Sequence, residues 1–167
     1  MGGMSPITHI LAGGGCRLQV GTDLMTLKLS GVDTLGAFAL AEVAIPPQGG
    51  PPGLHTHPSA ETCLVLDGEL EFATVVDGQV CMLAGTAGTV VHIPGFAPHT
   101  FRNVGTTPAR MLMLVTPADL EQFYLEAGVP VSDPAQPPPP GVPSDEEWMM
   151  SLYRKHRIVF LDPPLHR

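Results

Sequence analysis

The chain has 167 residues, of which 44% are hydrophobic and only 14% are charged, a composition that predicts one folded domain with a sizeable core. Its formal net charge is −8, with 8 Lys and Arg residues against 16 Asp and Glu residues. Such a balance argues against a nucleic-acid-binding surface, because phosphate contacts require clustered cations. No apolar run approaches the ~18 residues that a membrane-spanning helix needs, so we expect no membrane partner.

Residues 1–20 are predicted to be an N-terminal arm that is rich in glycine and ends in a short strand over residues 16–20. The first fifteen residues contain no Lys or Arg and no sustained apolar segment, so they do not resemble a secretory signal. The cysteines, Cys16, Cys63 and Cys81, are odd in number and show no CxxC spacing, which favours reduced thiols. We therefore expect a cytoplasmic protein.

Residues 21–116 are predicted to form an all-β domain of many short strands. The Asp-Gly pairs at 67–68 and 77–78 are the clearest turns, because Asp-Gly readily adopts the positive φ values of tight hairpins. Between these turns, two sets of alternating residues predict one buried and one solvated face: Leu70, Phe72 and Thr74, then Glu69, Glu71 and Ala73. Short strands at this spacing predict a sandwich or a jelly roll.

Four candidate metal ligands lie in this β domain: His55, His57, Glu61 and His99. His55 and His57 are two residues apart, so both project from one face of an extended strand. Glu61 shares their parity, and His99 would come from a later strand that a closed sheet brings alongside. Three imidazoles and one carboxylate suit a divalent first-row transition metal (Fe, Mn, Ni, Co, Cu or Zn). The sequence therefore predicts a site for one such ion per chain.

The run Gly49-x5-His55-x-His57-x3-Glu61-x6-Gly68 resembles the first sequence motif of the cupin family, G-x5-HxH-x3,4-E-x6-G. The resemblance implies a single jelly-roll barrel, also called a double-stranded β-helix, with the candidate ligands inside it. We therefore predict an all-β cupin barrel that is followed by a short C-terminal helical extension.

Residues 88–103 resemble the second cupin motif, G-x5-P-x-G-x2-H-x3-N, and place His99 at the histidine of that motif. Phe96 stands where the motif has Gly, and we expect the neighbouring Gly95 to supply the turn. The local sequence of residues 98–103, Pro-His-Thr-Phe-Arg-Asn, is similar to that of single-domain cupins of the quercetin-dioxygenase-like group. His92 is expected to be structural or exposed rather than a ligand.

The extension over residues 117–167 also resembles this group of cupins, although relatives often read HGI and LGPPL where this chain has Arg157 and Asp162. Helical periodicity over residues 119–127 places Leu120, Phe123 and Tyr124 on one face. A Pro-rich stretch, residues 130–143, is predicted to be an extended connector.

A second helix is predicted over residues 145–156, with Ser144 and Glu147 in a capping box at its start. It would present four large side chains: Trp148, Met149, Leu152 and Tyr153. Packing of this helix against the barrel exterior or a partner subunit is the favoured interpretation. A lid over the barrel mouth is the alternative.

The resemblance to quercetinase-like cupins implies a metal-dependent dioxygenase that acts on a small organic molecule. Glu61 would orient the substrate and take its proton, which makes it the candidate catalytic residue. Two alternatives use the same ligands. One is a non-oxidative cupin enzyme (isomerase, cyclase or decarboxylase), in which the metal polarises a carbonyl or enol. The other is a non-catalytic module that binds a metal or a small molecule. The fold does not choose between them, because function depends on the site.

No Lys or Arg falls near the motifs except Arg102, whose parity opposite to that of His99 points it outward, so we predict a neutral or aromatic substrate. Phe101 shares the parity of His99 and is predicted to be barrel core, with a place in the cavity wall as the alternative. A homodimer is also expected. Small cupins commonly pair through their sheets, and residues 111–115 are apolar on both faces, both of which must then be covered.

Overall fold

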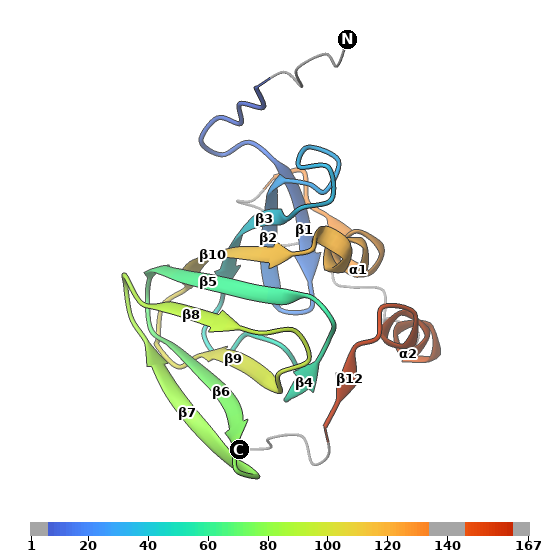
Figure 1. Cartoon of the computed structure of the whole chain (residues 1–167). Helices are drawn as coiled ribbons and strands as arrows, with labels where there is room; N and C mark the ends of the chain where they lie inside the picture. The colour runs from blue at the N-terminus through green and yellow to red at the C-terminus, as the bar shows by residue number, and fades with distance from the viewer. Residues whose placement is uncertain (1–6, 134–145, 162–167) are drawn as a thin grey trace.

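The structure, a computed structural model, describes residues 7–133 and 146–161, which form two antiparallel sheets and a few short helices (Figure 1). From edge to edge, the larger sheet consists of β11 (Val129–Pro130), β1 (Cys16–Val20), β2 (Asp23–Leu29), β3 (Ala39–Ile45), β10 (Ala109–Thr116), β5 (Ala60–Asp67) and β8 (Val90–Ile93). The smaller sheet consists of β12 (Val159–Phe160), β4 (His55–Thr56), β9 (His99–Asn103), β6 (Leu70–Val76) and β7 (Gln79–Gly85). This jelly-roll arrangement confirms the predicted fold class.

The core lies between the two sheets and follows the two-residue period of the strands. Strand β3 buries every second residue, from Ala39 to Ile45. Strand β10 does the same between its neighbours β3 and β5: Met111, Met113 and Val115 are buried, whereas Leu112 and Leu114 are half-buried on the other face.

Strand β6 shows the predicted alternation at its start and departs from it at Ala73 and at Thr74, which is half-buried rather than buried. Leu70 and Phe72 are buried and Glu71 is half-buried, but Ala73, expected on the solvated face, is only 2% exposed. Its small side chain lies between Met82 of β7 and Thr100 of β9, its cross-strand partners, and these cover it. The hairpin that follows has φ values of 51° at residue 77 and 75° at residue 78, which confirms the turn predicted there.

The helical residues gather beside one end of the barrel (Figure 1). The helix predicted over residues 119–127 is a 3₁₀ turn, η1 (Ala118–Leu120), followed by α1 (Glu121–Ala127). The second predicted helix is α2 (Glu146–Lys155). Ser144, most of the Pro-rich stretch and Asp162 lie outside the described residues. No helix in the described part of the chain is long and apolar enough to cross a membrane.

The segment formed by α2 and β12 is attached to α1 by polar contacts and to the barrel by strand pairing. Its Lys155 forms an ion pair with Glu126 of α1 at 2.8 Å, and the Nε2 atom of His156 lies 3.2 Å from the same carboxylate. Strand β12 follows α2 and pairs with β4, so the chain runs from the helix along the edge of the smaller sheet (Figure 1). The segment after the barrel is therefore held next to the strand that begins with His55.

Candidate metal centre

His55 and His99 lie opposite each other in the smaller sheet. They are paired in the register between β4 and β9, and their ring centroids are 4.5 Å apart. His57 follows β4, and its ring lies 4.7 Å from that of His99. The candidate ligand atoms of the three histidines lie within 4.8 Å of one another, so these residues can hold a metal ion.

Glu61 reaches the histidines from the larger sheet, where it lies on β5. Its Oε1 atom is 3.2 Å from Nε2 of His57, and its Oε2 atom is 3.8 Å from Nε2 of His99. All four side chains are buried. The structure thus brings together the four residues that the spacing pointed to, with the carboxylate on one sheet and the imidazoles on the other side of the barrel.

Backbone carbonyl groups fix the orientation of all three imidazoles. Each Nδ1 atom lies 2.8–2.9 Å from a carbonyl oxygen two residues away, in the pairs His55–Gly53, His57–Ser59 and His99–Ala97. A carbonyl oxygen only accepts hydrogen bonds, so each Nδ1 carries the proton and each Nε2 presents its lone pair. Histidines that bind metals are commonly held in this way.

The Nε2 atoms of His57 and His99 are the buried side-chain polar atoms that lack a hydrogen-bond partner among the described residues. An unsatisfied buried polar atom costs roughly 1–3 kcal/mol. Coordination to a metal ion would satisfy both atoms, and imidazole and carboxylate are ligands that first-row transition metals accept. The residues present therefore fit such an ion.

The protonation states in the cluster also suit metal binding, which requires neutral imidazoles and an ionised carboxylate. Burial lowers the pKa of His55 to about 4, with a further contribution from His99. Burial lowers the pKa of His99 as well. For Glu61, burial alone would raise the pKa, but a hydrogen bond from protonated His57 and the positive charge of the protonated imidazoles bring it below its usual value. Once the imidazoles are neutral, a bound cation would keep this carboxylate ionised in the same way.

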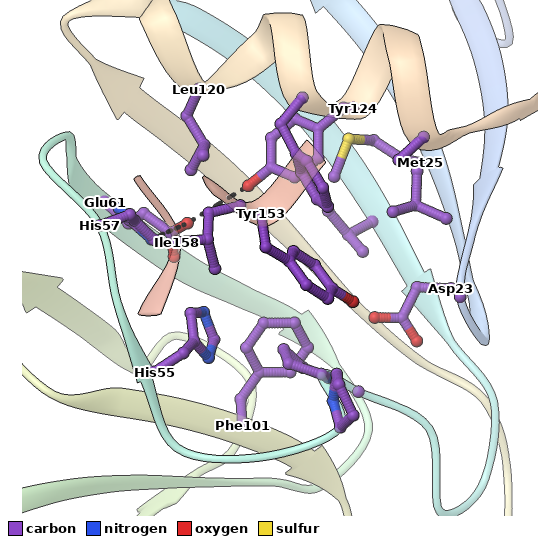
Figure 2. Close-up of a pocket in the computed structure, with 18 of the residues that line it drawn as sticks. Asp23, Met25, His55, His57, Glu61, Phe101, Leu120, Tyr124, Tyr153 and Ile158 are labelled. Atoms are coloured by element: carbon purple, nitrogen blue, oxygen red, sulfur yellow. Dashed lines mark hydrogen bonds and ion pairs between the residues drawn. The ribbon is translucent and has the colours of Figure 1, made fainter. Parts of the chain in front are cut away.

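Tyr124 of α1 contacts the cluster directly. Its hydroxyl group donates a hydrogen bond to Oε1 of Glu61 at 3.3 Å (Figure 2). Burial, together with the negative charge of Glu61, raises the pKa of this phenol well above its usual value, so it stays protonated. The sequence placed Tyr124 on one face of a helix together with Leu120 and Phe123 without assigning it to the site, because helical periodicity does not show what that face contacts.

The cluster opens into a largely apolar pocket of about 150 Å³ (Figure 2). Strands of the larger sheet contribute Met25, Val43 and Met113 to its wall, and α1 contributes Phe123. Phe101 is only 8% exposed and belongs both to the core and to this wall, so both interpretations of it hold. No Lys or Arg occurs among the described residues that line the pocket.

Asp23, at the start of β2, also lines this pocket and was missed by the sequence analysis. Burial raises the pKa of its carboxyl group to about 6, although hydrogen bonds from the Thr22 hydroxyl and the Gly50 amide oppose the shift. Asp23 shares the parity of Met25 and Leu27, which are buried on the same strand. The sequence does contain a clue to this position, because Asp23 falls at the same alternate positions of the strand as these apolar residues.

Helix α2 covers part of the pocket. Met149 and Tyr153 line it, and Leu152 is 5% exposed, whereas Trp148 is 43% exposed. This position places α2 in the wall of the pocket, which is closer to the alternative interpretation than to packing on the barrel exterior. Contact with a partner subunit stays a prediction. The pairing of β12 with β4 accounts for the position of α2 at the pocket, because it brings the residues that follow α2 back to the site.

Of the three departures from the glycines of the family, the two that lie within the described residues occupy left-handed backbone conformations. Phe96 has a φ of 64° and Arg157 a φ of 55°. The expectation that Gly95 supplies the turn is wrong, since the positive φ lies at Phe96. Gly95 serves a close approach instead, because a Cβ atom there would lie 2.2 Å from the carbonyl oxygen of Pro58.

Two side chains near the motifs point away from the site, as expected. Arg102 is exposed and donates a hydrogen bond to Gln48. His92 is exposed too, and its Nδ1 atom lies 2.9 Å from the hydroxyl group of Thr62.

Comparison with known proteins agrees with the jelly-roll fold. Residues 41–115 match the family profile described as a cupin domain. A recombinant oxalate oxidase in complex with glycolate is 26% identical with a TM-score of 0.50, over 58% of this chain and 52% of that chain, so the match spans about half of that protein. No curated protein sequence matches the chain.

Two further solved structures share the fold at lower identity. An oxalate decarboxylase formate complex from Lactobacillus farciminis is 22% identical with a TM-score of 0.53, over 61% of this chain and 31% of that chain. A predicted oxalate decarboxylase from Thermotoga maritima is 20% identical with a TM-score of 0.56, over 66% of this chain and 99% of that chain. Residues 41–115 thus match the profile of a cupin domain, and the jelly-roll fold is shared with these solved structures.

Proposed function

We propose that this protein is a metal-dependent cupin enzyme that acts on a small organic molecule, and that it is a dioxygenase of the quercetinase-like type. The observation that carries the proposal is the convergence of three oriented imidazoles and one carboxylate beside an apolar pocket. His55, His57, Glu61 and His99 would hold one divalent ion (Fe, Mn, Ni, Co, Cu or Zn). When bound, the ion supplies a docking point for a substrate oxygen and, if redox-active, couples the substrate to O2.

Glu61 is proposed to be the catalytic base. Its lowered pKa keeps it ionised at neutral pH, and Tyr124 donates its hydrogen bond to Oε1, so Oε2 is the atom better placed to accept a proton. A carboxylate with a lowered pKa is a weak base, so it would take the proton of an enol or phenol whose oxygen is bound to the ion, because coordination makes that proton more acidic.

The walls of the pocket support a neutral or aromatic substrate. No cationic side chain lines it in the described part of the chain, and Asp23 and Glu61 both place carboxyl groups there. A dicarboxylate such as oxalate, which appears in the names of the similar structures, would have to enter next to these acids without a counter-charge. The aromatic rings of Phe101 and Tyr153 favour a flat, apolar body instead.

We also infer a cytoplasmic homodimer. The described cysteines are free thiols, which suits a reducing compartment. Apolar side chains on or near the edge strands β7 and β8 are 40% or more exposed: Val80, Met82, Leu83 and Val90. A second copy would cover them, so light scattering should give twice the chain mass, and Met82→Glu should shift the protein towards monomer. A strict monomer at micromolar concentration contradicts this inference.

The decisive experiment compares activity with and without O2 across a panel of metals. The Fe-, Mn-, Co- or Ni-loaded protein should consume O2 when it is given a flavonol or a related enolic, hydroxylated aromatic molecule. Glu61→Gln keeps an oxygen ligand but removes the base, so it should retain more metal than His99→Ala while turnover falls by about 10²–10⁴-fold. His92→Ala, which changes an exposed histidine, is the control and should behave as wild type.

Each alternative predicts a different result from the same panel. Equal aerobic and anaerobic rates, supported by Zn as well as by Fe, would indicate a non-oxidative enzyme in which the metal acts as a Lewis acid. Metal binding without turnover of any substrate would indicate a binding module.

A further inference from the structure

Asp23 places a carboxyl group on the opposite side of the pocket from the metal ligands. Its side chain is buried, with only 8% of the residue exposed. Strand β2, which carries it, is separated from the strand of Glu61 by β3 and β10. Figure 2 shows its carboxyl group pointing into the pocket, with His55, His57 and Glu61 on the far side.

Within residues 7–133 and 146–161, no cationic side chain lies in the pocket wall beside the carboxyl group of Asp23. The Thr22 hydroxyl donates a hydrogen bond to Oδ1 at 2.8 Å, and the Gly50 amide makes a smaller contribution. Burying an unpaired carboxylate in apolar surroundings is costly, and burial accordingly raises its pKa to about 6. A substrate group that donates a hydrogen bond would relieve that cost.

We propose that Asp23 binds a hydrogen-bond-donating group, a hydroxyl or a protonated amine, at the end of the substrate that lies remote from the histidine cluster. This proposal rests on the proposed function, because it takes the histidine cluster as the binding point for the other end. The substrate class follows from the two ends together. It is a small molecule with an apolar, flat body, an oxygen donor at one end and a hydroxyl or amine at the other. A distal carboxylate is rejected by charge repulsion.

A purely structural role for Asp23 makes a different prediction. The Thr22 hydroxyl also accepts a hydrogen bond from the Gly50 amide at 3.0 Å, so Asp23 and Thr22 together tie the start of β2 to the loop at Gly50. If that is the whole role of Asp23, replacing it would change the stability of the protein and would weaken the binding of all ligands by a similar factor. A recognition role changes the ratio between ligands, which is therefore the quantity to measure.

The test uses two series of metal-binding probes of different length, benzohydroxamic acids substituted at position 4 and 3-hydroxyflavones substituted at position 4′. Each series carries a hydroxyl, aminomethyl, methoxy or carboxylate group. Affinities for the Zn-loaded protein are measured by titration calorimetry without O2, so no turnover is needed. In the series that spans the pocket, the hydroxyl and aminomethyl probes should bind about tenfold more tightly than the methoxy probe, and the carboxylate probe most weakly.

Two variants assign this preference to Asp23. Asp23→Asn should reduce the aminomethyl preference more than the hydroxyl preference, because the amide still accepts a hydrogen bond but carries no charge. Asp23→Leu should abolish both. Asp33→Asn, which changes an exposed aspartate in the loop after β2, is the control and should retain the wild-type ratios.

The two proposals fail in different ways. A wild-type protein without donor preference in either series, or Asp23 variants that keep it, would overturn the role of Asp23. Donor preference that depends on Asp23, without O2 uptake by the Fe-loaded protein, would support that role and reject the dioxygenase. If His55→Ala leaves the affinity of the unsubstituted probes unchanged, the histidine cluster is not their binding point, and both proposals fail.

Discussion

Phe160 of β12 lies directly opposite His55 of β4 in the register between these strands, and their ring centroids are 5.4 Å apart. The ring of Phe160 also packs edge to face with that of Tyr153, at 4.9 Å. A residue close to the end of the described chain therefore contacts a candidate metal ligand. The C-terminal extension is thus part of the wall of the site rather than an appendage to the barrel.

Metal binding is the first prediction. Purified protein without a His tag should bind close to one equivalent of divalent metal per chain, measured by elemental analysis after reconstitution. His55→Ala, His57→Ala and His99→Ala should each reduce this strongly, because each removes an oriented Nε2 atom. Chelation should lower the melting temperature, since an ion bound to the native state stabilises it by mass action. His92→Ala should bind as much metal as the wild-type protein. A stoichiometry well below one metal ion per chain in the wild-type protein would contradict the proposed metal site.

The second prediction concerns the position of α2. Leu152→Ala should destabilise the protein by about 2–4 kcal/mol, as is usual when a buried leucine is truncated. Trp148 is the single tryptophan of the chain and lies on α2, so its emission should shift to longer wavelength if the helix loosens. Met150→Ala removes a side chain on a residue that is 44% exposed and should change stability by less than about 0.5 kcal/mol. Equal effects of the two substitutions would argue against α2 packing on the pocket.

The raised pKa of Asp23 makes a prediction about stability and pH. Its folded value of about 6 lies above the ordinary value of 3.8, so the folded state binds the proton more tightly than the unfolded state. The stability from this group is fully present below pH 3.8 and is lost as the pH rises through 6. Removing the charge should therefore stabilise the protein near neutral pH.

Asp23→Asn tests this by urea unfolding at several pH values. Near pH 7 the variant should be more stable than wild type by up to about 3 kcal/mol, from roughly two pH units at 1.36 kcal/mol each. This advantage should disappear near pH 4. Asp33→Asn should act in the opposite direction, since hydrogen bonds from Ser30 lower the pKa of Asp33. A pH-independent difference for Asp23→Asn would refute the assignment.

The left-handed conformation of Phe96 predicts a stabilising substitution. A residue with a Cβ atom loses roughly 1–2 kcal/mol in this conformation, and glycine gives back about 0.5–1 kcal/mol in backbone entropy. Because Phe96 is 63% exposed, little packing is lost, and Phe96→Gly should stabilise the protein by up to about 1 kcal/mol in thermal unfolding. Phe96→Ala keeps the Cβ atom, so it should give no gain. Destabilisation by both substitutions would mean that the phenyl ring makes a contact that matters.

Much of the barrel, and the convergence of the three histidines with Glu61, could be predicted from the sequence. The two-residue period of a strand fixes the parity of His55 and His57, and the resemblance to the cupins indicated that Glu61 and His99 would join them. These predictions succeed because short-range geometry and a specific motif carry them.

The remainder of the pocket depends on contacts between distant segments, which spacing does not encode. Tyr124 reaches Glu61 only because α1 packs across the barrel end. Tyr153 reaches the pocket only because β12 returns to β4. The conformation of Phe96 was also missed, because Gly95 next to it offered a plausible turn residue and the choice depends on the approach of Pro58.

The carbonyl groups that orient the imidazoles belong to Gly53, Ser59 and Ala97. Every amino acid brings a backbone carbonyl, so no replacement of the side chains at these positions removes the hydrogen-bond acceptor. The tautomer of each of the three histidines therefore does not depend on the side chains at these positions, and only a change in the path of the main chain can alter it. Substitutions in the loops around the site that preserve the path of the main chain would leave the orientation of the imidazoles largely intact while they change the shape of the pocket.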